Sequence, residues 1–219
     1  MWATQTARFV GAQAPALPGH PDGAPLRSVG DIADVVADDV AASPRPRVLV
    51  GHSLGGAVAI ELALRRPSLA DGLILIATGA RLPVRADLDA RGAGDFPAMC
   101  HRLVEAAFAE PGSALGRGAL GALGALGPAA LRADHEACAA FDTRERAGQV
   151  SQPALVVAGG DDRLVAGSVS EELAGLLPNA EHRVVAGAGH MLIVEEAGVV
   201  NLMVAAYLAR LEPALAGGP

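Results

Sequence analysis

A predicted strand, a sharp glycine-rich turn and a predicted helix follow one another without a break in RVLVGHSLGGAVAIELALRRP, from Arg47 to Pro67. The apolar run RVLVGH is typical of a strand, and residues 54–66 are typical of a helix that ends before Pro67. The turn between them carries Ser53. This unit constrains the fold toward strands that alternate with helices, because it joins an apolar strand directly to a helix that packs against it.

The turn Gly-His-Ser-Leu-Gly matches the pattern G-x-S-x-G, in which a serine on a strained strand-to-helix turn exposes its hydroxyl. Gly51 and Gly55 are expected to leave room for the backbone to close, and Gly56 to let the helix pack near the strand. The helix N-terminus offers backbone N–H groups and a positive dipole end, so the N–H of Leu54 is the candidate donor to a substrate oxyanion. The alternative is a serine with only a structural role in a glycine-rich turn.

Strand and helix patterns alternate along most of the chain, which predicts an α/β fold with a mostly parallel, doubly wound sheet. Continuous apolar runs suit the middle of such a sheet, where both faces are covered. The other predicted strands lie near residues 9–16 and in GLILIATG, PALVVAGG and EHRVV, and the other predicted helices lie at 2–9, after Ser28, in SVSEELAGLLP and at 195–211.

Several predicted helix ends have recognisable signals. Ser28 is expected to cap a helix that Pro44 stops, and Ser168 and Glu171 have the spacing of a capping box. The C-terminal PALAGGP is expected to fray.

Residues 84–150 have no strand pattern and are predicted to form a helical cap inserted into the core. The chain then divides into a core segment at 1–83, a cap at 84–150 and a second core segment at 151–219. The repeat GALGALGAL at 118–126 is expected to be loose, because each glycine costs a helix about 1 kcal/mol. Four apolar residues of the cap either line a substrate pocket or serve ordinary helix packing: Phe96, Met99, Leu103 and Phe108.

Composition excludes several classes of partner. The chain has 219 residues, a formal charge of −7, no lysine and 17 arginines without a cluster, which argues against nucleic acid. No secretory signal is recognisable, and no apolar run approaches the roughly 20 residues that span a bilayer. Cys100 and Cys138 lack a C-x-x-C spacing, which favours reduced thiols in a cytoplasmic protein. No ligand cluster suggests a metal, no organic cofactor is implied, and the oligomeric state is left open.

A serine nucleophile needs a base, and the base needs a carboxylate that fixes its tautomer. Of the six histidines, His190 follows a strand and a small-residue loop, which places it at the carboxyl edge of a parallel sheet, where sites gather. His52 belongs to the turn and is expected to point away from the serine hydroxyl. Asp161 and Asp162 follow another strand, and at least one of them is expected to be a solvated turn residue.

Three segments resemble the α/β-hydrolase superfamily: VLVGHSLGGAVA, PALVVAGGDDRLV and AGAGHMLIVEEAGVV. The resemblance implies Ser53 as nucleophile, His190 as base and Asp162 as acid, with Asp161 as the alternative acid. It implies a cap-bearing serine hydrolase that cleaves a small carboxylic ester or related acyl substrate through an acyl-enzyme, without a metal or organic cofactor. Esterase, thioesterase, lactonase, carbon–carbon hydrolase and acyltransferase activities are not separated by these residues.

One part of the superfamily pattern is missing. Members usually carry an early strand ending in His-Gly, whose loop supplies a second oxyanion N–H, and this chain has no His-Gly dipeptide. The expected consequence is a gap between the strand near 9–16 and the strand at 46–51. The favoured explanation is a start placed too far downstream, or a fragment, and the alternative is a degenerate copy. A rival interpretation is a non-catalytic or impaired α/β-hydrolase-like protein.

Overall fold

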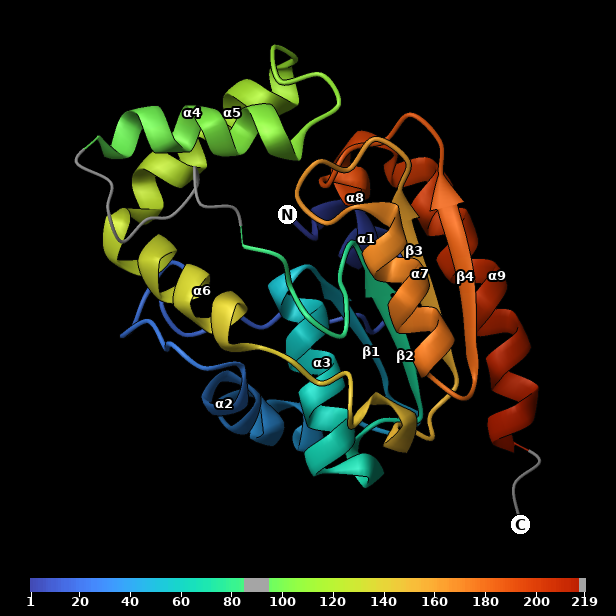
Figure 1. Cartoon of the computed structure of the whole chain (residues 1–219). Helices are drawn as coiled ribbons and strands as arrows, with labels where there is room; N and C mark the ends of the chain where they lie inside the picture. Colours follow the sequence, from blue (N-terminus) through green and yellow to red (C-terminus); the bar gives the residue numbers. More distant parts are fainter. Residues whose placement is uncertain (85–94, 217–219) are drawn as a thin grey trace.

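The computed structural model describes residues 1–84 and 95–216. Among these residues, four parallel strands form one sheet whose spatial order follows the chain. The strands are β1 (Val48–His52), β2 (Gly72–Ile76), β3 (Ala154–Gly159) and β4 (Ala180–Val185). Because all four run in the same direction, their carboxyl ends meet at one edge of the sheet (Figure 1). The predicted α/β fold with a parallel sheet is confirmed.

Helices cover both faces of the sheet. All five residues of β2 are buried, and alternate side chains enter opposite layers: Leu73 and Leu75 on one face, Ile74 and Ile76 on the other. The first layer contains α2 (Val29–Ala42), α3 (Leu54–Arg65) and α7 (Gly167–Leu176), and the second contains α1 (Ala3–Arg8), α8 (Leu192–Glu195) and α9 (Ala197–Ala216) (Figure 1). Short 3₁₀ turns η1 (Pro67–Leu69) and η3 (Ala147–Gln149) complete the first layer.

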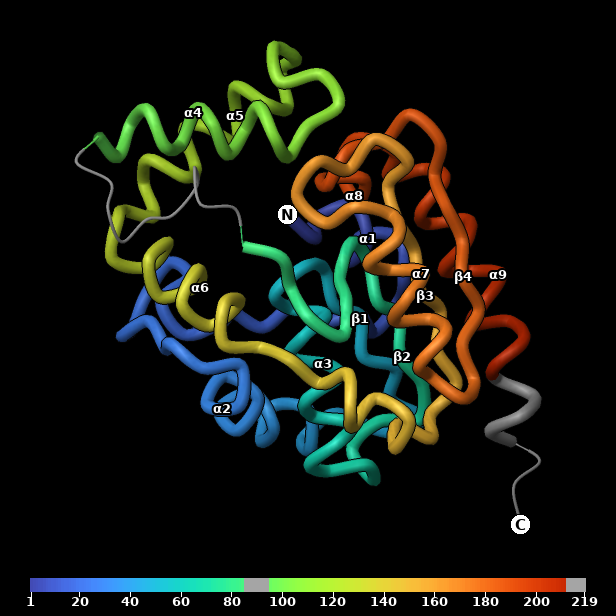
Figure 2. Tube along the Cα trace, in the orientation of Figure 1, coloured from blue at the N-terminus to red at the C-terminus, as the bar shows by residue number. Residues whose placement is uncertain are grey.

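Three further helices follow β2 in sequence: α4 (Phe96–Ala107), α5 (Ala114–Leu126) and α6 (Pro128–Ala140). Figure 1 shows α4 and α5 beyond the carboxyl ends of the strands, and α6 running back beside α2 and α3. The chain leaves and re-enters the core at one place, which Figure 2 traces. There Arg81 and Asp142 form an antiparallel bridge, and Thr143 donates from its N–H and its hydroxyl to the Ala80 carbonyl at 2.7 and 2.9 Å.

The predicted strand near residues 9–16 is wrong, and residues 1–47 contain no strand. Residues 10–16 are exposed, and Pro15 removes an N–H donor that a strand would need. As a result, β1 is an edge strand among the described residues, and Val50 on it is 42% exposed. The early strands of the superfamily pattern are missing as predicted, but at an edge of the sheet and without a gap in its middle.

The repeat GALGALGAL, which is expected to be loose, lies within helix α5. The Ser113 hydroxyl caps this helix by accepting from the N–H of Gly116 at 3.2 Å. Leu120 and Leu123 pack against Val104 and Phe108 of the α4 segment. This tertiary packing offsets the low helix propensity of glycine.

Some predicted helix ends agree with the structure and others differ. The Ser28 hydroxyl accepts from the N–H of Asp31, so the predicted cap is confirmed. The capping box at Ser168 is wrong, because α7 already begins at Gly167 and places Ser168 inside the first turn. Helix α9 reaches Ala216, so the predicted fraying of PALAGGP does not begin at its start, and residues 217–219 of that tail lie outside the described residues.

No single helix in the described ranges is both long and apolar enough to cross a membrane, although α5 and α6, bent by 99° at their junction, pass that test as a pair on length and composition. Cys100 on α4 and Cys138 on α6 are both free thiols.

Candidate active site

Ser53 lies on the strained turn that the sequence predicts, between β1 and α3. Its backbone angles are φ 53° and ψ −119°, a conformation that L-residues rarely adopt. Two hydrogen bonds hold the turn: the Ser53 N–H donates to the Ile76 carbonyl, and the Thr78 hydroxyl donates to the Ser53 carbonyl, both at 2.9 Å. The neighbouring strand β2 therefore fixes the position of the serine.

The glycines around Ser53 have different roles. A Cβ on Gly51 would lie 2.3 Å from the Gly55 carbonyl oxygen, so no side chain fits there. A Cβ on Gly56 would lie 2.5 Å from the Thr78 methyl group, which explains the close packing of α3 on the segment after β2. A Cβ on Gly55 would meet nothing within 4 Å, so the predicted steric need for glycine at that position is wrong.

His190 and Asp162 form a buried pair at the same sheet edge. The His190 Nδ1–H donates to Asp162 Oδ2 at 2.8 Å, and the Asp162 side chain is fully buried. The other carboxylate oxygen accepts from the N–H groups of Leu164 and Val165, both at 2.8 Å. A carboxylate held in this way fixes the imidazole tautomer with its lone pair on Nε2, which is the form of a general base.

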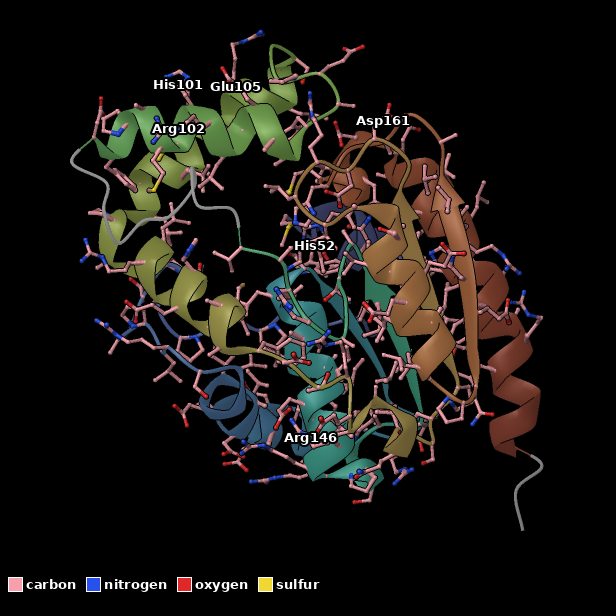
Figure 3. The ribbon with its side chains drawn as sticks, viewed as in Figure 1. His52, His101, Arg102, Glu105, Arg146 and Asp161 are labelled. Atoms are coloured by element: carbon pink, nitrogen blue, oxygen red, sulfur yellow. The ribbon has the colours of Figure 1, made fainter. Side chains whose placement is uncertain are left out.

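The structure separates the two adjacent aspartates. Asp161 is exposed, and Figure 3 shows it on the loops beyond β3, away from the centre of the molecule. Asp162 contacts His190, so the structure brings together three of the predicted residues, Ser53, Asp162 and His190, at the carboxyl edge of the sheet. No hydrogen bond joins Ser53 to His190 among the described groups, although both side chains line one cavity.

The N–H of Leu54 is the first of helix α3 and donates to no described acceptor. It lies at the positive end of the helix dipole, beside Ser53. Residues 1–47 form no strand that would carry a second donor of the kind the superfamily pattern contains.

His52 contacts the candidate base, His190. This contact was not predicted from the sequence. The His52 ring lies 4.8 Å from the His190 ring, between centroids, and its Nε2–H donates to the His190 carbonyl at 2.7 Å. Burial, and then the proximity of His190, lower the pKa of His52 to about 3. His52 is therefore neutral at physiological pH, and it anchors the backbone of His190 without adding a second positive charge. Figure 3 shows His52 near the middle of the molecule, by the carboxyl ends of the strands.

The lowered pKa of His52 predicts a pH dependence of stability. Below pH 6.5 the unfolded chain binds a proton at this residue that the folded chain does not, so stability falls as pH falls from about 6.5 toward 3. The share lost by pH 5 is about 2 kcal/mol. We expect His52→Gln to remove this share, so that its free energy of unfolding changes less between pH 7 and pH 5 than that of the wild type in urea titrations.

A matched control is His101→Gln, an exposed histidine on α4 (Figure 3). It should leave the pH dependence of unfolding unchanged. Equal slopes for the wild type and His52→Gln would contradict the buried, neutral state of His52.

Glu195 ties the loop of His190 to the end of helix α4. Its two carboxylate oxygens accept from the N–H groups of Ala109, at 2.7 Å, and Gly189, at 2.9 Å. Next to this clamp, the N–H of Met191 donates to the Ala107 carbonyl at 3.0 Å. The sequence signal was faint: an acidic residue five positions after His190, at the end of a short helix.

One cavity of about 230 Å³ adjoins Ser53 and His190. Its remaining walls come from three regions and are largely apolar: Leu54, Leu82, Pro83, Val84, Leu103, Leu131, Asp134, His135, Cys138, Leu164 and Val165. Of the four apolar candidates named from sequence, only Leu103 lines it. Met99 and Phe108 are buried in packing, and helix α6 supplies residues that the sequence did not indicate.

No group of three or more His, Cys, Asp or Glu side chains that could hold a metal ion occurs in residues 1–84 and 95–216.

Comparison with known proteins identifies the family. The sequence profile described as "Alpha/beta hydrolase family" matches residues 2–202. The chain belongs to this family. Among solved structures, a thermophilic esterase superposes with a TM-score of 0.87 at 28% identity, covering 95% of this chain and 86% of the esterase.

Two similar proteins have names that describe an activity. A pimeloyl-[acyl-carrier protein] methyl ester esterase of Xanthomonas axonopodis is 31% identical over 84% of this chain and 79% of its own length. A protein provisionally assigned as the carbamate hydrolase RutD of Variovorax paradoxus is 32% identical over 82% of this chain and 74% of its own length. The predicted hydrolase of the alpha/beta hydrolase type is confirmed by these relatives, and their names describe ester or carbamate cleavage.

Proposed function

We propose that the protein is a serine hydrolase that cleaves small carboxylic esters through an acyl-enzyme. The observation that carries this proposal is the buried His190–Asp162 pair, which lines one cavity together with a serine held on a strained turn. The esterases among the relatives support the same reaction class. The apolar walls and the volume of about 230 Å³ favour a short acyl group.

In the proposed mechanism, Ser53 Oγ attacks the ester carbonyl carbon while His190 Nε2 accepts the hydroxyl proton. Asp162 keeps Nδ1 protonated and stabilises the imidazolium that forms. The N–H of Leu54 donates to the oxyanion of the tetrahedral intermediate. Collapse of this intermediate breaks the ester C–O bond, and His190 returns the proton to the leaving alcohol. A water molecule, deprotonated by His190, then releases the acid and regenerates Ser53.

We further propose that residues 84–150 act as a cap over the site. The adjacent exit and re-entry segments at Ala80 and Thr143 support an insertion at one point of the core. The Glu195 carboxylate accepts from Ala109 in this cap and from Gly189 in the loop of His190, and these two hydrogen bonds connect the segments.

The test is covalent trapping of the nucleophile. A fluorophosphonate probe is expected to add one label per chain, and peptide mapping should locate it on Ser53. A p-nitrophenyl acetate assay should show turnover, with a burst if deacylation is slow. Absence of both labelling and turnover would contradict the proposal and favour the non-catalytic alternative.

A further inference from the structure

Among the described residues that line the cavity beside Ser53, one is acidic, Asp134. It lies on helix α6, whereas Ser53 and His190 follow strands β1 and β4. Most of the walls between them are hydrocarbon, so a carboxylate in this cavity is costly unless it has a partner. Its structural partner is His20, whose Nε2 lies 2.9 Å from Asp134 Oδ2.

The surroundings of His20 favour a protonated, positively charged ring beside the Asp134 carboxylate. The second ring nitrogen of His20, Nδ1, lies 3.3 Å from the Pro18 carbonyl, which can only accept a hydrogen bond. Both ring nitrogens therefore face acceptors, and this arrangement favours the doubly protonated imidazolium. The hydrogen bond with Asp134 raises the pKa of His20 accordingly. The positive charge of His20 balances the carboxylate, so a ligand at this end of the cavity need not supply a cation.

The two carboxylate oxygens of Asp134 differ in their contacts with the described residues. His20 occupies Oδ2, and Oδ1 has no hydrogen-bond donor among the described residues. Attachment of α6 to the N-terminal loop does not depend on Asp134 alone, because Arg27 and Glu136 make a second pair at 2.9 Å between the same two segments. Glu136 does not line the cavity, which makes it a natural control.

We propose that Asp134 is a specificity residue that accepts a hydrogen bond from a neutral donor, a hydroxyl or amide N–H, on the part of the substrate remote from the ester. The inference rests on the proposed ester hydrolysis at Ser53. The substrate class is then a short, largely apolar ester with a neutral hydrogen-bond donor at its far end. A carboxylate at that position is disfavoured, because it would meet the Asp134 oxygen.

The test compares pairs of methyl esters of equal size, ω-hydroxyalkanoates and the alkanoates in which a methyl group replaces the hydroxyl, with chains of four to seven carbons. Hydrolysis is followed by pH-stat titration. At the chain length that reaches Asp134, we expect kcat/KM of the wild type to favour the hydroxy ester by about 10- to 100-fold. In Asp134→Leu, the preference should fall below one, because the donor then meets an apolar wall.

Each variant provides its own reference, since the ratio of the two esters is measured on the same preparation. Glu136→Gln should keep the ratio of the wild type. If Asp134→Leu does not fold, Asp134→Ala serves, and its ratio should fall to about one, because alanine has no acceptor. An active wild type without preference at any length, or an unchanged ratio in the folded Asp134 variants, would overturn the inference. Failure of the proposed function is distinguishable from failure of the inference about Asp134. If the proposed function is wrong, neither ester is hydrolysed and Ser53 is not labelled.

Discussion

Replacing Ser53 by alanine should abolish ester hydrolysis, with a fall in kcat of about 10⁴- to 10⁶-fold on p-nitrophenyl acetate. The reason is the loss of the nucleophile, since the remaining groups only bind and polarise the ester. Fluorophosphonate labelling should disappear in the same variant. Ser151→Ala, at an exposed serine, is the control and should label and turn over like the wild type. Equal labelling of Ser53→Ala and the wild type would show that Ser53 is not the nucleophile.

The same position allows the backbone strain to be measured. Glycine adopts φ 53°, ψ −119° readily, so Ser53→Gly should unfold at higher urea concentration than Ser53→Ala, by about 1 kcal/mol or more in free energy. Both variants should be equally inactive. A glycine variant that is no more stable than the alanine variant would mean that the turn stores no strain.

Asp162→Asn is expected to lower kcat by about 10⁴-fold with little change in the fold. The asparagine carbonyl oxygen can still accept from the N–H groups of Leu164 and Val165, which turns the amide nitrogen toward His190 Nδ1. An N–H at that position stabilises the tautomer with the proton on Nε2, which cannot accept the Ser53 proton. The measurement is kcat for p-nitrophenyl acetate.

Asp161→Asn is the matched control, because it makes the same substitution at the aspartate next to Asp162 in the chain. Because Asp161 is exposed, its variant should stay within a few-fold of the wild type. A large loss in Asp161→Asn, or a small one in Asp162→Asn, would reverse the assignment of the acid.

The local parts of the fold were predictable from sequence because short-range patterns determine them. Strands β1 to β4, the helix capped by Ser28 and the turn at Ser53 each follow from a few neighbouring residues. The predictions that were wrong involve competition between local preference and tertiary context. The glycine repeat of α5 becomes helical because its leucines pack on α4, and the run near residues 9–16 is not a strand because no partner strand pairs with it.

The candidate site divides in the same way. The sequence by itself indicated Ser53 and His190 and limited the candidate acid to two adjacent aspartates. Each of these residues lies just after an apolar strand, and parallel strands bring such positions to one edge of the sheet. Only the tertiary structure decided that Asp162 holds His190, that His52 anchors its backbone and that Asp134 lines the cavity. These contacts join segments between 28 and 138 residues apart, and no local pattern encodes a contact that depends on how whole layers pack.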